Sequence, residues 1–242
     1  MEFDNTAQRL AAALRMRTEP IAISFYNAPP AGERFERAVP APTADGRTGK
    51  VSAGCVFWVE AGRQAFWTTK QDHANCSVGS FTHGFLSLEA AGAGADVGAL
   101  LEAGWVGKSD FGSIEHVSIE PAAISYGPLS TAQGTPDVVL LMLSSIGAMI
   151  FRDAMPEARI EGKPQCHIVA IAKEKEQFAI SFGCMLSRTR TGMPSGEMTA
   201  VIPGPRLAEA LERIERAAEV DKTVASYASI DAQRFDRPST GR

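Results

Sequence analysis

The 242-residue chain has no large excess of either charge, no long hydrophobic run and only four cysteines. Its formal net charge is -4 and its basic residues are spread along the sequence, which argues against a nucleic-acid-binding surface. The longest apolar run, 138–151, is interrupted by two serines and a glycine, and it is shorter than the roughly 20 residues that a membrane helix needs. We therefore expect neither a nucleic-acid partner nor a membrane span.

An apolar signal core is also missing from the first ten residues, MEFDNTAQRL, which carry acidic residues instead. On this ground we expect a cytoplasmic protein. Structural disulfides are rare in a reducing compartment, so the cysteines are candidates for metal binding, for catalysis or for plain burial as small apolar side chains. A chain of this length can form a hydrophobic core without disulfides, so stability does not force the cysteines into use.

Helical and strand patterns alternate along the chain. The patterns predict helices over 5–17, from residue 77 onward, and over 96–103, 144–155 and 205–220. They predict strands over 21–25, 116–121, 122–129, 136–143, 164–173, 176–187 and 197–203. Residues 51–69 are compatible with a hairpin or with a short helix followed by a strand, 28–50 with a long loop, and 231–242 with a frayed tail. We expect an α/β (or α+β) fold with a mixed β-sheet core flanked by helices, in a single compact domain over 1–242, possibly of two lobes.

The residues with the richest chemistry gather in two segments. The first, 55–83, contains Cys55, Cys76, His73 and His83, and the second contains Cys166, His167 and Cys184. The cysteine spacing matches no compact zinc-finger or ferredoxin motif. Cys76 is expected at the N-terminus of a helix, where backbone amides stabilise a thiolate. A Cys/His zinc site, a Rieske-like site and a thiolate activated by an imidazole all remain open at this point.

A set of short motifs in a fixed order resembles a known family. The motifs are Cys55, Ala61-Gly62, Asp72-His73, Cys76-x-x-Gly79, Pro136-Asp137-Val138, Cys166, Ser181-x-Gly183-Cys184, Arg188 and Glu197-Met198. Over about residues 6–218 this order is similar to the family called domain of unknown function 169. The chain differs from the usual pattern at Gly183, where proline usually stands, and at His167, where a small residue usually stands.

The resemblance implies that Cys55, Cys76, Cys166 and Cys184 are ligands of one metal centre. The leading hypothesis is a [4Fe-4S] cluster bound by these four cysteines, with zinc as a less favoured alternative. If only three cysteines bind, the open iron could act as a Lewis acid on a small molecule, with His73 or Arg188 as the nearby polar group. The expected partners are a small-molecule substrate or a redox partner, and a homodimer is possible.

Three other functions remain as alternatives. In a metal-free thiol enzyme, Cys76 would be a nucleophile activated by His73 or His83, with its substrate near Trp58 and Trp67. A haem-binding protein would use a cysteine or histidine as the axial ligand. A non-catalytic binding or interaction module would need none of the cysteines.

Overall fold

The computed structural model describes residues 3–35, 55–73, 76–191 and 193–234. The strands of this part are β1 (Ile21–Tyr26), β2 (Phe66–Thr68), β3 (Ala123–Pro128), β4 (Val138–Leu143), β5 (Arg159–Glu161), β6 (Ala179–Ser181) and β7 (Met198–Pro203). The α-helices are α1 (Asp4–Ala13), α2 (Cys55–Ala61), α3 (Ser77–Thr82), α4 (Leu88–Gly92), α5 (Ala95–Glu102), α6 (Ser145–Ala154), α7 (His167–Lys175), α8 (Met185–Thr191) and α9 (Leu207–Arg234). Four short 3-10 helices complete the described elements: η1 (Lys70–His73), η2 (Lys108–Ser113), η3 (Leu129–Thr131) and η4 (Gly204–Arg206).

The strands form one seven-stranded sheet in the order β2-β3-β1-β4-β7-β6-β5. Neighbouring strands run antiparallel except for β5 and β6, which are parallel. The expected mixed sheet flanked by helices is therefore confirmed. Each helix in the described part of the chain is too short or too polar to cross a lipid bilayer.

Strand β4 lies at the centre of the sheet and is buried on both faces. Its alternate residues Val139 and Leu141 pack into a hydrophobic cluster with α1, α6 and the first half of α9. Val138 and Leu140 point the other way, into a second cluster with α2 and α7. A six-residue run of apolar side chains is what burial on two faces requires, and the sequence shows such a run.

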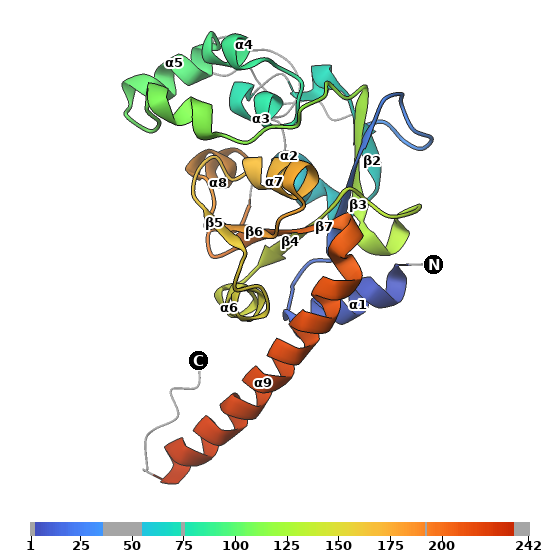
Figure 1. Cartoon of the computed structure of the whole chain (residues 1–242), viewed down its shortest axis with the longest axis vertical. Helices are drawn as coiled ribbons and strands as arrows, with labels where there is room; N and C mark the ends of the chain where they lie inside the picture. The colour runs from blue at the N-terminus through green and yellow to red at the C-terminus, as the bar shows by residue number, and fades with distance from the viewer. Residues whose placement is uncertain (1–2, 36–54, 74–75, 192, 235–242) are drawn as a thin grey trace.

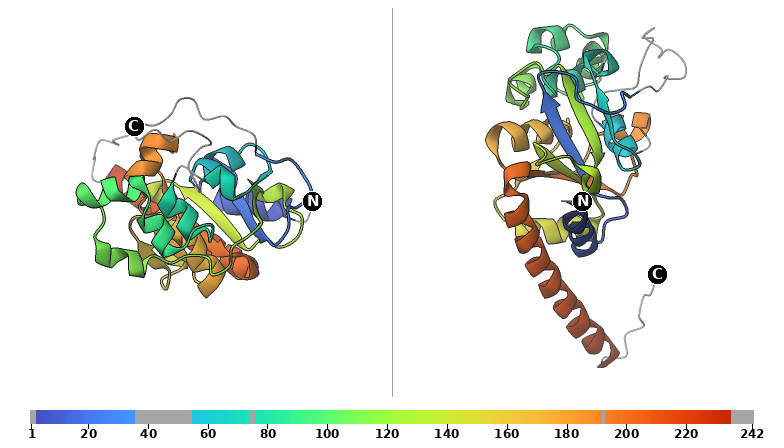
Figure 2. Two further views of the ribbon diagram at one scale, coloured as in Figure 1. Left: turned by 90° about the horizontal axis from the view of Figure 1, so that it is seen from above. Right: turned by 90° about the vertical axis from the view of Figure 1, so that its right-hand side faces the viewer.

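Two parts lie outside this layered body. Helices α3, α4 and α5 pack around a small hydrophobic cluster of their own, on the far side of α7 from the sheet (Figure 1). Helix α9 packs against α1 and α6 at its start, and its second half projects away from the body (Figure 2). The projecting half exposes an apolar stripe formed by Val220, Val224, Tyr227 and Ile230.

Most of the predicted elements are confirmed. Ser144 caps α6 by accepting a hydrogen bond from the Gly147 amide at 3.3 Å, as the sequence predicts. Residues 55–68 form a short helix followed by a strand, one of the two expected arrangements. Residues 36–50 of the predicted loop and 235–242 of the predicted tail lie outside the described residues.

The strand prediction for 164–173 is wrong, because these residues form the start of α7. Helix α7 lies between the sheet and the α3 layer, so Ile168 to Ala172 are all buried and the polar face that marks a helix in sequence is missing. The run of Ile and Val then resembles a buried strand. The strand prediction for 116–121 is also wrong: the described backbone is irregular there, and the Val117 amide donates to the Thr82 carbonyl instead of to a ladder.

The helix predicted from residue 77 onward is interrupted at Gly84. This glycine has φ +83°, and a Cβ at its position would lie 2.3 Å from the Ile119 carbonyl oxygen. A glycine allows the left-handed backbone and the close approach together, so α3 ends at Thr82 and α4 begins at Leu88. His83 therefore lies at the end of α3 and not in the middle of a long helix.

Candidate functional site

Each of the four cysteines lies at the start of a helix. Cys55 is the first residue of α2, Cys76 and Cys166 precede α3 and α7 directly, and Cys184 precedes α8. The expected position of Cys76 at a helix N-terminus is confirmed, and its sulfur accepts a hydrogen bond from the Gly79 amide at 3.3 Å. The first amides of a helix have no partner within the helix, so they are available to stabilise negative charge at sulfur.

The four thiols lie close enough together to influence one another electrostatically. The pKa of Cys55 is raised to about 12, mainly by burial. The charges of Cys76 and Cys184 act in the same direction. Burial also raises the pKa of Cys166 well above its usual range, with the charges of Cys76, Cys55 and Cys184 acting in the same direction. The fold therefore gathers cysteines from four distant segments into one region, where α2 contacts α8 and α3 contacts α7 (Figure 1).

Polar groups lie next to two of these sulfurs. A hydrogen bond from Ser187 lowers the pKa of Cys55 and one from Thr82 lowers that of Cys166, although burial outweighs both. Ser187 is held in place by Gln165, whose Nε2 donates to the Ser187 Oγ at 2.8 Å. Such hydrogen bonds are among the contacts that tune a metal centre with sulfur ligands.

The donor set suits a metal centre that prefers thiolates. None of the four cysteines is in a disulfide. As the side chains of the described residues stand, no three His, Cys, Asp or Glu groups are placed to hold a single ion. One zinc ion needs its sulfurs at about 2.3 Å from a common point, whereas each iron of a [4Fe-4S] cluster binds one thiolate, so the cluster tolerates more widely separated sulfurs.

His73 is completely buried among aromatic rings. Its ring centroid lies 4.7 Å from that of Phe57 and 4.6 Å from that of Phe85. Its Nε2 is 2.9 Å from the Thr68 hydroxyl, and its Nδ1 is buried without a hydrogen-bond partner. Burial, and secondarily the nearby His83, lowers the pKa of His73 well below its usual range, so the ring is neutral at physiological pH.

His83 lies next to His73, with the two ring centroids 5.7 Å apart. It is also completely buried, and its Nδ1 is 2.9 Å from the Gly79 carbonyl oxygen. Its Nε2 has no hydrogen-bond partner among the residues that the structure describes. Burial lowers the pKa of His83 to about 4, while the bond to Gly79 opposes that shift. The sequence interpretation of His83 as a packing residue accounts for its burial but not for its free nitrogen.

Arg188 holds the loop that contains Cys184. Its guanidinium donates to the carbonyl oxygens of Phe182, Pro194 and Glu197 at 2.8, 2.9 and 2.8 Å. Gly183 has φ +112°, and a Cβ there would lie 2.4 Å from the Arg188 guanidinium, which explains why glycine stands before this cysteine. These contacts give Arg188 a positioning role toward Cys184.

The remaining sequence candidates lie in different surroundings. Asp72, considered as a partner for the His73 ring, instead accepts from the Thr69 amide at 2.8 Å and pairs with Arg34 at 3.4 Å. The His167 Nε2 lies 3.3 Å from a carboxylate oxygen of Glu161, and burial lowers the pKa of the imidazole. The indole N–H of Trp67 donates to the Gly32 carbonyl oxygen at 2.9 Å.

Sequence reasoning missed Tyr126, which lies beside the thiols. The Tyr126 hydroxyl is buried, and burial raises its pKa well above the usual range, with the charges of Cys166 and Cys55 adding to that effect. It lies near Thr68, yet the geometry leaves it without a well-formed hydrogen bond. The Trp58 indole N–H is likewise buried without a partner. The alternation of β3, which puts Tyr126 on the same face as Ile124, was the available signal for Tyr126.

Comparison with known proteins gives one match. The family model described as "Uncharacterised ArCR, COG2043", the domain of unknown function 169 (DUF169), matches residues 9–213. Neither the curated proteins nor the solved structures contain a significant match.

Proposed function

The chain belongs to the domain of unknown function 169 family, and from its four converging cysteines we propose that it binds an iron–sulfur cluster, most simply [4Fe-4S]. The observation that supports this proposal is that the charges of Cys76 and Cys184 raise the pKa of both Cys55 and Cys166, which burial already raises. A thiolate that forms in such a site beside other thiolates is costly. Bound iron would supply the positive charge that offsets this cost.

The protein's own groups suit this role. The amide of Gly79 and the hydroxyls of Ser187 and Thr82 lie at three of the sulfurs and would stabilise thiolate charge. Cys166 lies in the hydrophobic cluster of α2 and α7, Cys55 packs against the same cluster, and Cys76 packs against the cluster of α3, α4 and α5. When bound, such a cluster supplies one-electron transfer or, at an iron without a cysteine ligand, Lewis acidity.

The number of cysteine ligands separates the two modes of action. With all four bound, the protein would transfer electrons to a redox partner or use the centre structurally. With three bound, a small molecule would occupy the fourth position, and His73 and Arg188 were predicted as its polar neighbours. Arg188 already donates to three carbonyl oxygens, so its contacts favour holding the Cys184 loop over touching a substrate.

Anaerobic purification followed by iron and sulfide analysis tests the proposal. We expect about four irons and four sulfides per chain, with a broad visible absorption that bleaches on reduction. A colourless protein without iron would contradict the cluster. Zinc in place of iron would support the alternative tetrathiolate site, and a sharp Soret band would indicate haem.

The metal-free thiol enzyme has less support. The hydrogen bonds of the His73 and His83 rings run to Thr68, Thr82 and Gly79. Selective labelling of one thiol at mildly acidic pH would revive this alternative.

Two coarser expectations complete the proposal. We propose that the protein works in the cytoplasm, where cysteines stay reduced. We also propose a homodimer, which the exposed apolar stripe of α9 supports. Light scattering on the purified protein, with Val224→Glu and Tyr227→Glu as disrupting variants, measures the oligomeric state; a monomer at micromolar concentration would contradict it.

A further inference from the structure

His73 and His83 form a pair of completely buried imidazoles with one free nitrogen each. Neither side chain has any solvent exposure. A buried acceptor without a partner is destabilising, so two of them in adjacent rings call for a common explanation. The cysteine site does not supply one, because the ring hydrogen bonds of both histidines run to other groups.

The protonated nitrogen of His73 follows from its neighbour Thr68. The single hydroxyl hydrogen of Thr68 is donated to the Ile124 carbonyl oxygen at 3.2 Å. Thr68 must therefore accept at its other contact, from the His73 Nε2–H at 2.9 Å. The neutral ring then has its lone pair on Nδ1, the atom that is buried without a partner.

The same reasoning assigns the opposite tautomer to His83. A carbonyl oxygen only accepts, so the 2.9 Å contact of His83 with Gly79 requires the hydrogen on Nδ1. The lone pair of His83 is therefore on Nε2, again the unpartnered atom. Histidines that bind a metal almost always donate their other ring N–H to a backbone carbonyl or a similar acceptor, and both rings do so here.

The separation of the rings also suits a shared ligand. A metal–nitrogen bond of about 2.0–2.1 Å puts each ring centroid about 3.2 Å from the ion. Two imidazoles at a tetrahedral or wider angle then have centroids about 5–6 Å apart. The observed separation is 5.7 Å. The rings of Phe57 and Phe85 pack against His73, and the ring of Phe25 stacks on His83.

We propose that His73 Nδ1 and His83 Nε2 are the protein ligands of a mononuclear transition-metal site, separate from the cysteine centre. Neutral imidazole suits zinc, nickel, cobalt or copper. Since the described residues place no third His, Cys, Asp or Glu for a common ion, the other coordination positions would belong to a small exogenous ligand.

Two variants remove the free lone pairs and keep the structural hydrogen bonds. His73→Gln retains a donor in place of Nε2–H for Thr68, and His83→Asn retains one in place of Nδ1–H for Gly79. His116→Asn is the matched control, because His116 is exposed and stacks on Phe81 away from the pair. Thr68→Val keeps both ligands but removes the group that orients His73.

The experiment dialyses the full chain, purified anaerobically with its native iron, against Co²⁺ and then measures cobalt, iron and sulfide in the same samples. We expect one cobalt per chain with nitrogen-type absorption, its loss in His73→Gln and His83→Asn, and its retention in His116→Asn. Thr68→Val should weaken binding by about 10–100-fold.

The proposal is overturned if wild-type protein binds no cobalt, which would leave a trapped water as the partner of both nitrogens. It is also overturned if both histidine variants keep the cobalt, or if the spectrum shows thiolate-to-cobalt charge transfer. If circular dichroism shows that a histidine variant does not fold, the cobalt stoichiometry of the wild type and the cobalt affinity of Thr68→Val still test the proposal. The iron and sulfide values show in the same samples whether the cluster is present. Cobalt bound by a protein without iron and sulfide would support the histidine site and contradict the cluster proposal.

Discussion

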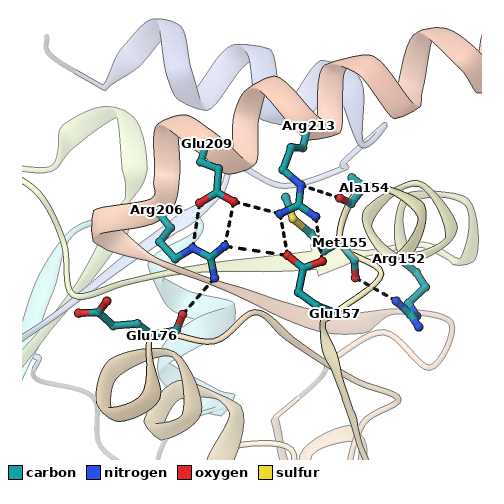
Figure 3. Close-up of polar contacts among 8 residues, drawn as sticks. All are labelled: Arg152, Ala154, Met155, Glu157, Glu176, Arg206, Glu209 and Arg213. Atoms are coloured by element: carbon teal, nitrogen blue, oxygen red, sulfur yellow. Dashed lines mark hydrogen bonds and ion pairs between the residues drawn. The ribbon is translucent and has the colours of Figure 1, made fainter.

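The start of α9 and the core around His73 are both rich in polar groups. The polar groups of α9 have hydrogen-bond and ion-pair partners, whereas several around His73 do not. At α9, Arg206, Glu209, Arg213 and Glu157 form a closed network of charges (Figure 3). Both oxygens of Glu157 accept from Arg213, at 2.6 and 2.8 Å, and the remaining donor contacts of the arginines run to the Ala154 and Glu176 carbonyl oxygens.

The core around His73 leaves its polar atoms open. His73, His83, Tyr126 and Trp58 each contain a buried polar atom without a hydrogen-bond partner. A folded protein rarely tolerates such atoms unless something else binds to them. The difference teaches that the α9 network stabilises the fold through satisfied charges, whereas the unsatisfied atoms around His73 are the basis of the ligand site that we propose.

Replacing a cysteine should have the largest effect. Cys166→Ser removes a buried sulfur that is coupled to the other three, so we expect loss of most of the iron and of the visible absorption. Iron analysis and the visible spectrum measure this outcome. Ser181→Ala is the control, because its hydroxyl donates to the Gly162 carbonyl oxygen and not to a thiol. Full iron content in Cys166→Ser would remove this cysteine from the ligand set.

Acid should destabilise the metal-free protein through His83. Its folded pKa of about 4 lies below the unfolded value of about 6.5, so the stabilisation is present above pH 6.5 and is lost as the pH falls toward 4. Over this window the loss amounts to about 3 kcal/mol. Urea unfolding at several pH values, compared between wild type and His83→Asn, measures it. Parallel pH profiles for the two proteins would show that His83 titrates normally.

Breaking the closed network should cost less. Arg213→Ala removes the hydrogen bond to the Ala154 carbonyl, the two bonds to Glu157 and the contact with Phe178, whose ring lies 5.7 Å from the guanidinium. We expect a loss of about 1–2 kcal/mol in the free energy of unfolding, with no change in iron content. Arg213→Lys should recover only part of it, because lysine lacks the planar fork. Loss of iron in Arg213→Ala would break the distinction between the two regions.

The sequence predicted the parts of the fold that alternate or repeat with a clear period. The capped helix after Ser144 and the double-faced strand β4 follow from local patterns, and both are confirmed. Helix α7 was missed because burial on every side removes the polar face that distinguishes a helix from a strand. The break at Gly84 depends on the approach of the Ile119 carbonyl, a contact that no local pattern contains.

The candidate site was likewise predictable only in part from the sequence. The four cysteines were identifiable by residue type and by family resemblance, although their meeting depends on the whole fold. The pairing of His73 with His83 was not predictable, because it requires the tautomers that Thr68 and Gly79 impose across tertiary contacts. Chemistry-rich residues are visible in a sequence, but whether their polar atoms are satisfied becomes visible only in the structure.

The smallest expected effect on stability concerns an exposed ion pair. Arg9 on α1 and Glu215 on α9 form a bidentate pair at 2.6 and 2.7 Å, with side chains 44% and 36% exposed. Water solvates both groups well, so Arg9→Ala should leave the free energy of unfolding unchanged within error in physiological salt. Thermal unfolding of Arg9→Ala beside Arg213→Ala measures the contrast. If the two variants lose equal stability, geometry alone would explain the α9 network and its burial against Phe178 would contribute nothing.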